Sequence, residues 1–67
     1  MSAWVDQFFN AASAQNGGVI RRSMYDVERF DVLDEIIDRA EVEGWHVIET
    51  GGQLVVLCHA GSMTIHC

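Results

Sequence analysis

The last third of the chain, from Gly44 to Cys67, constrains the fold more than any other stretch. Residues 50–53 read TGGQ, and a Gly-Gly turn between two alternating runs is typical of a two-residue β-hairpin. A second turn, AGSM at residues 60–63, predicts a further strand over 63–67. The stretch therefore predicts a C-terminal antiparallel three-stranded meander.

The first turn also predicts a register. With Gly51-Gly52 as the loop, the pairs are Thr50 with Gln53, Ile48 with Val55, Val47 with Val56, and His46 with Leu57. A loop at 61–62 would pair His59 with Thr64 and Leu57 with His66, and this second register stays open. Because side chains alternate along a strand, one face collects Trp45, Val47, Leu54, Val56, Cys58, Met63, Ile65 and Cys67. The other face collects His46, Ile48, Thr50, Gln53, Val55, Leu57, His59, Thr64 and His66.

Two segments have helical spacing. Residues 2–15 begin at a possible N-cap, Ser2, and end before the sequence NGG at 16–18. Their apolar face holds Trp4, Val5, Phe8, Phe9 and Ala12. Residues 31–43 form the second helix, with Asp31 as the expected cap and Gly44 as the stop. Its buried stripe, Leu33, Ile36, Ile37 and Ala40, should cover the first sheet face. Whether the first helix covers the second sheet face stays open.

Residues 18–25 read GVIRRSMY and predict a strand, because β-branched residues follow Gly18 without a breaker. Neither side of this strand is cleanly apolar, so we expect it at a sheet edge. A right-handed crossover through 31–43 would set it parallel to 45–50, although its pairing partner stays open. The predicted class is α+β, a two-layer domain with the order α-β-α-β-β-β.

The 67 residues form a single domain, 1–67, that buries only about 60% of its unfolded surface. Chains of this size often add a disulfide, a metal or a second subunit. Since 49% of the residues are hydrophobic, self-association is one way in which the chain could bury further apolar surface. The sequence has no basic signal region and no apolar run near the roughly 20 residues of a membrane span. We expect a cytoplasmic protein in which Cys58 and Cys67 are reduced thiols.

Ten Asp and Glu against four Arg and no Lys give a net charge of −6. Such an acidic chain lacks the positive surface that nucleic-acid and membrane-surface binding use. An alternative reading, a degenerate nucleic-acid-binding module, would need the four arginines on one surface: Arg21, Arg22, Arg29 and Arg39.

All cysteines and histidines lie in the last third of the chain, and thiolate and imidazole are the ligands that zinc prefers. Cys58 and His59 are neighbours on a strand, so they point to opposite faces and cannot share one ion or act as a catalytic pair. We therefore expect no cofactor and no enzymatic activity. A metal site formed by His46, His59 and His66 remains an alternative, because all three share the second face.

From residue 31 onward, the order helix, Gly44-Trp45, strand, glycine turn, strand, turn, strand resembles the HicA-type toxin module, which has a double-stranded-RNA-binding-like fold. That family carries a catalytic histidine just after the glycine turn, and this chain has Gln53 there. The pattern GGVIRRS…DVERF…LDEIID…GWHVIETGGQLVVLC also resembles short, uncharacterised proteobacterial proteins. Neither resemblance implies an activity for this chain.

The sequence thus favours a small non-enzymatic protein-interaction or regulatory module. Ile48, Val55 and Leu57 leave apolar area on the second sheet face that needs a cover. We expect that cover to be a second copy, giving a homodimer, or another protein. The predicted interaction face is His46, Ile48, Val55, Leu57, His59 and His66.

Overall fold

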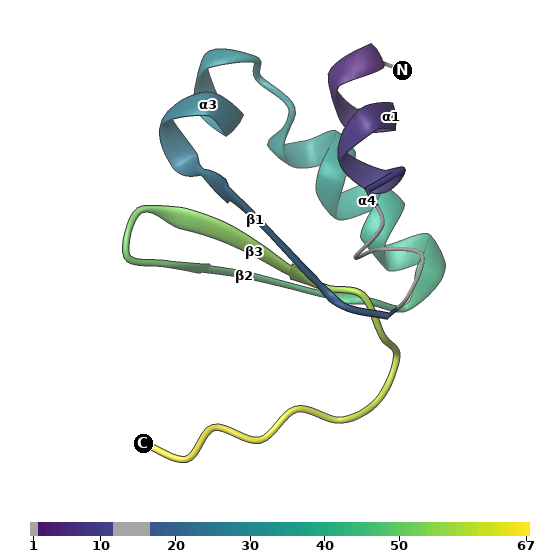
Figure 1. The fold of residues 1–67 in the computed structure, drawn as a ribbon, viewed down its shortest axis with the longest axis vertical. Helices are drawn as coiled ribbons and strands as arrows, with labels where there is room; N and C mark the ends of the chain where they lie inside the picture. Colours follow the sequence, from purple (N-terminus) through teal and green to yellow (C-terminus); the bar gives the residue numbers. More distant parts are fainter. Residues whose placement is uncertain (1, 12–16) are drawn as a thin grey trace.

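The computed structural model describes residues 2–11 and 17–67. It has two layers, a three-stranded antiparallel sheet and a set of helices on one side of that sheet (Figure 1). This confirms the α+β class. No helix in the described part is long and apolar enough to cross a membrane. The elements in chain order are α1 (Ala3–Phe9), β1 (Val19–Ser23), α3 (Met24–Arg29), α4 (Leu33–Glu43), β2 (His46–Thr50) and β3 (Gln53–Leu57).

The hairpin of β2 and β3 has the predicted register. The four predicted pairs form, from Thr50 with Gln53 at the turn to His46 with Leu57 at the open end. Gly51 and Gly52 both have positive φ, 55° and 74°. The left-handed conformation at both loop positions is the one that a type I′ turn demands and that glycine adopts without strain.

The prediction of a C-terminal three-stranded meander is wrong for its third strand. Residues 63–67 form no strand, and the sheet order is β1-β3-β2. Leu57 pairs with Val19 of β1 instead of His66, and His59 does not pair with Thr64. The edge beside β3 is therefore occupied by a strand that precedes it by more than thirty residues, a non-local pairing that turn signals cannot reveal.

Strand β1 lies at a sheet edge, as predicted from its mixed faces. It runs in the same direction as β2, because both are antiparallel to β3. The two parallel strands are not neighbours, however, since β3 lies between them.

The predicted strand 18–25 ends early because a short helix begins inside it. Met24 is the first residue of α3, and the Ser23 side chain accepts a hydrogen bond from the Tyr25 amide at 3.1 Å. Asp26 lies in the first turn and Arg29 in the last, where the helix dipole stabilises a negative and a positive charge respectively. The sequence Ser23-x-x-Asp26 is a helix-start signal that the strand prediction overlooked.

Helix α4 lies inside the predicted range 31–43, but Asp31 is not its cap. The N-cap position is Val32, with no side-chain hydrogen bond, and Asp31 has φ 53° after the end of α3. Aspartate tolerates this left-handed conformation better than most residues. At the other end Gly44 has φ 75° and caps the helix as predicted.

Helix α1 begins at the predicted N-cap. Ser2 accepts a hydrogen bond from the Val5 amide, and the helix ends at Phe9 with Asn10 as its C-cap. It is therefore shorter than the predicted 2–15, whose residues 12–15, including Ala12, lie outside the described residues. The helix lies on the same side of the sheet as α4 (Figure 1). The second sheet face is thus not covered by α1.

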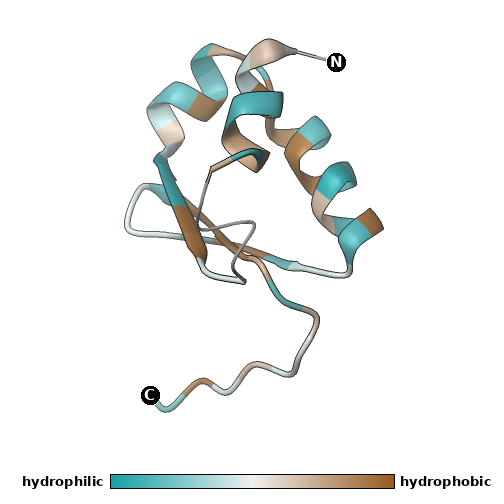
Figure 2. Ribbon diagram, turned by 45° about the vertical axis from the view of Figure 1, so that its right-hand side comes forward, coloured by the Kyte–Doolittle hydropathy of each residue, from teal (hydrophilic) through white to brown (hydrophobic). Residues whose placement is uncertain are grey.

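The core lies between the helices and the inner side of the sheet. Val5 and Phe8 of α1, Ile36 of α4 and Leu54 and Val56 of β3 are almost fully buried. In Figure 2 hydrophobic and hydrophilic residues alternate along α1 and α4, as expected of helices with one buried side.

Aromatic rings link the elements of the helical layer. Adjacent ring centroids are 5.1 to 6.0 Å apart, a spacing at which aromatic pairs attract. Phe8 is near the middle of this row and is 2% exposed. In order the row is Trp45, Phe9, Phe8, Trp4 and Phe30.

The substitution Phe8→Ala should remove most of the stability of the fold. Emptying a buried phenylalanine site costs about 3–5 kcal/mol, whereas a domain of this length has roughly 3–10 kcal/mol in total. Urea unfolding followed by tryptophan fluorescence measures the loss. Val42→Ala is the control, because Val42 is 85% exposed and its truncation should change stability by less than about 0.5 kcal/mol. Similar midpoints for the two variants would contradict the central role of Phe8.

Candidate functional site

The side of the sheet away from the helices is the candidate site, and we call it the outer face. The strand registers place three rows of side chains on it, one from each strand. These residues are Val19, Arg21 and Ser23 of β1, Gln53, Val55 and Leu57 of β3, and His46, Ile48 and Thr50 of β2.

Apolar side chains form the centre of the outer face. Val55 lies in the middle strand between Arg21 and Ile48 and is 8% exposed. Val19 and Ile48, on the two edge strands, remain 49% and 36% exposed. The described helices lie on the opposite side of the sheet (Figure 1), so Val19 and Ile48 meet solvent, while their neighbours on the face shield most of Val55.

The acidic residues of the protein lie away from the outer face. Nine of the ten acidic residues lie on α1, α3, α4 or the loop between the last two. The tenth, Glu49, is on β2 but pairs with Leu54, a residue of the inner side. The outer face carries only the guanidinium of Arg21 and the imidazole of His46. In a chain of net charge −6, one whole side of the sheet has no carboxylate.

The structure places four of the six residues predicted for the interaction face on the outer face itself, and the ring of a fifth, His59, contacts His46 from beyond the sheet. These four are His46, Ile48, Val55 and Leu57. His59 and His66 follow the end of β3 and lie outside the sheet. Strand β1 adds Val19 and Arg21, which the sequence prediction missed because the pairing partner of this strand was open. The alternation of residues 18–25 was visible in the sequence, but alternation does not identify a neighbour.

The segment after Cys58, residues 59–67, leaves the sheet on the side of the outer face; we call it the tail (Figure 1). Two histidines fix its first turn. His46 Nε2 donates to the Gly61 carbonyl at 2.6 Å, and the Gly61 amide donates to His59 Nδ1 at 3.1 Å. The two imidazole rings meet edge to face with centroids 5.5 Å apart. Beyond this turn the tail extends away from its own sheet (Figure 1).

The histidines and cysteines do not assemble a metal site. Within residues 2–11 and 17–67, no group of three or more His, Cys, Asp or Glu side chains is placed to hold an ion. His46 and His59 are close, but both ring nitrogens named above are already bonded to Gly61. The three-histidine alternative with His66 is therefore not assembled.

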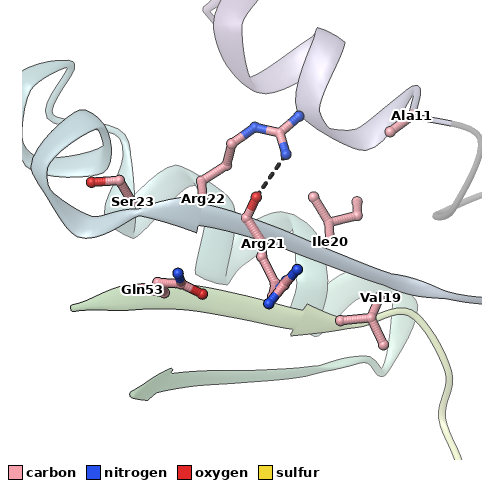
Figure 3. Close-up of a pocket in the computed structure, with 7 residues that line it drawn as sticks. All are labelled: Ala11, Val19, Ile20, Arg21, Arg22, Ser23 and Gln53. Carbon is pink, nitrogen blue, oxygen red and sulfur yellow. Dashed lines mark hydrogen bonds between the residues drawn. The ribbon is translucent and has the colours of Figure 1, made fainter. Parts of the chain in front are cut away.

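The four arginines do not share one surface. Figure 3 shows Arg21 and Arg22 leaving β1 in opposite directions. Arg39 forms an ion pair with Asp6 at 2.9 Å, which neutralises its charge locally. The nucleic-acid alternative thus lacks the clustering that it requires. Three guanidinium groups lie over aromatic rings of the helical layer: Arg22 over Phe8 at 5.4 Å, Arg29 over Phe30 at 5.5 Å, and Arg39 over Phe9 at 4.8 Å.

The two thiols have opposite environments. Cys58 is buried in the core, where desolvation raises the pKa of its thiol, and Cys67 is exposed on the tail. The Cys58 thiol donates a weak hydrogen bond to the Val56 carbonyl at 3.7 Å. A protonated, enclosed thiol is a poor nucleophile.

Comparison with protein families, curated proteins and solved structures finds no match to this chain. No relative therefore bears on the resemblance to the HicA-type module, and the candidate site rests on the geometry of its own residues.

The substitution His59→Phe should loosen the first turn of the tail. Phenylalanine keeps a ring beside His46 but offers no acceptor to the Gly61 amide. The heteronuclear ¹H–¹⁵N NOE of Gly61 should fall toward the values of a mobile segment. His66→Phe is the matched control and should leave that NOE unchanged. An unchanged Gly61 NOE in His59→Phe would show that the bond to His59 does not order the turn.

Alkylation should distinguish Cys58 from Cys67. Under native conditions iodoacetamide should modify Cys67 within minutes, whereas Cys58 should react only when urea unfolds the chain.

Because the pKa of Cys58 is raised in the folded state, the unfolded state loses this proton first as pH rises. The stability that the protonated Cys58 thiol contributes to the folded state is therefore fully present at neutral pH. It is lost as the unfolded chain ionises, so the free energy of unfolding should fall at alkaline pH. Cys58→Ala should lack that part of the decrease; an identical decrease in both proteins would contradict the assignment.

Proposed function

We propose that this protein is a small protein-interaction module that binds a second copy of itself through the outer face. The observation that supports the proposal most directly is an apolar sheet face that none of the described helices covers. Val19, Ile48, Val55 and Leu57 form one contiguous group across three strands. Contiguous apolar area of this kind on a small domain is typical of an interaction site.

The charge distribution favours a second copy as the occupant. Two molecules of net charge −6 repel each other in most orientations. Contact between two outer faces is the orientation that brings no carboxylate opposite another. Such a contact is two-fold symmetric, and symmetric dimers are the commonest oligomers of soluble proteins.

The proposal gives the protein a binding or regulatory role and no catalytic one. The thiol of Cys58 is enclosed in the core on the side opposite the outer face, where it is a poor nucleophile. We place the protein in the cytoplasm, a setting in which both free thiols stay reduced. If the outer face instead serves a different protein, the same residues would form that interface.

The substitution Ile48→Asp tests the proposal. Ile48 is partly exposed, so aspartate there should not unfold the domain, but it would place two carboxylates in the centre of the interface. Light scattering should give a dimer mass for the unmodified protein and a monomer mass for the variant at the same concentration. Leu57→Asp should act in the same way.

Val42→Asp is the matched control, because Val42 is an exposed apolar residue of α4 on the other side of the molecule. It should leave the dimer mass unchanged. A monomer mass for the unmodified protein at high concentration, or a dimer that tolerates both outer-face aspartates, would refute the proposal.

A further inference from the structure

The outer face alone is small for a stable dimer. Three strands spaced about 4.8 Å apart, with five residues each at about 3.4 Å, cover roughly 240 Å² in projection. Stable interfaces bury about 800 Å² per partner. The proposed dimer therefore needs a second contact. The structure offers two parts that could form it, the outer edge of β1 and the tail.

Within residues 2–11 and 17–67, no strand pairs with the outer edge of β1, and the hydrogen bonds of β1 to β3 show which of its backbone groups face that edge. The Cys58 amide donates to the Gly18 carbonyl at 2.9 Å, and the Met24 amide donates to the Gly52 carbonyl at 2.8 Å. Even-numbered residues of β1 thus face β3 with their backbone groups, since bonding alternates along an antiparallel pair. The amides of Val19 and Arg21 point away from β3, toward the open side. Unpaired groups of this kind bind an added strand.

A groove of about 400 Å³ runs beside this edge (Figure 3). The whole of β1 lines it, together with Ala11 and Gln53. The Arg22 guanidinium also lies there and donates to the Arg21 carbonyl at 2.7 Å. This contact covers one acceptor of the edge, and a charged side chain on an edge strand limits unspecific pairing.

The tail has the pattern of a strand but no strand partner in the described part of its own chain. Met63 and Ile65 alternate with Thr64 and His66, and Ile65 is 77% exposed. Beyond Gly61, no hydrogen bond joins the tail to the rest of the described chain. It leaves on the side of the outer face (Figures 1 and 2), which is where a second copy would lie.

We infer that the tail of each copy adds as a fourth strand to the free edge of β1 in the other copy, so that the dimer exchanges its tails. This inference rests on the proposed dimer and names its second contact. The added strand accepts from the Val19 and Arg21 amides and lies along the groove beside β1. The hydrogen bond from the Arg22 guanidinium to the Arg21 carbonyl either breaks, which frees that carbonyl for the added strand, or persists while the other backbone groups of the edge pair.

Amide hydrogen exchange by NMR tests the inference on the full chain, below and above the concentration at which it associates. On association the Val19 and Arg21 amides should exchange at least tenfold more slowly. The Ile20 and Arg22 amides, which face β3, are internal controls and should be protected at both concentrations.

A double variant, Thr64→Pro with Ile65→Pro, identifies the added strand. Proline at two successive positions removes an amide from each edge of the tail, so no register of addition survives intact. The variant should lose the protection of Val19 and Arg21 and associate at least tenfold more weakly. Thr64→Ala with Ile65→Val keeps the amides and the apolar character, and it should behave like the unmodified protein.

The outcomes separate the inference from the proposed function. A dimer in which Val19 and Arg21 stay unprotected, or stay protected in the proline variant, overturns tail exchange and leaves the outer-face dimer standing. Protection that does not depend on concentration would show that the β1 edge is already covered within a single chain, which also overturns the exchange. A monomer at every concentration overturns both.

Discussion

The packing of α1 onto the inner side of the sheet is the interaction on which the rest of the structure depends. A seven-residue helix is too short to be stable alone, so α1 exists because Phe8 and Phe9 are buried against the sheet and α4. Two polar contacts hold its orientation: the Ser2 amide donates to Glu35 at 3.2 Å, and Arg39 pairs with Asp6 at 2.9 Å. Since a 67-residue chain has few helices, placing α1 beside α4 leaves the outer face bare.

The parts of the fold that the sequence predicts are those set by local rules. The Gly51-Gly52 turn fixes the register of β2 and β3, because a two-residue loop allows one alignment and the alternation of apolar residues agrees with it. Helix α4 follows from its apolar spacing and from Gly44. In both cases every signal lies within about a dozen residues.

The errors arise where distant segments compete for the same position. Residues 63–67 alternate like a strand, but β1 occupies the edge of β3 that they would need. Choosing between these two segments requires the energy of the whole sheet, which no local pattern contains. The candidate site shows the same limit: the outer-face residues of the hairpin were predictable, whereas Val19 and Arg21 became part of it only through that pairing.

The distribution of charge also explains why an assembly through the outer face would stop at two copies. An added strand at a free edge can in principle recruit further chains without end. Here a reciprocal exchange would use the one tail and the open β1 edge of each copy, so that β2 is the edge strand that remains. The helical layers then face outward with their carboxylates on Asp34, Glu35, Asp38, Glu41 and Glu43 of α4 among others. Like-charged surfaces of this kind repel further copies, so the proposed two-fold dimer would cover the apolar face and the β1 edge together while the acidic side stays in water.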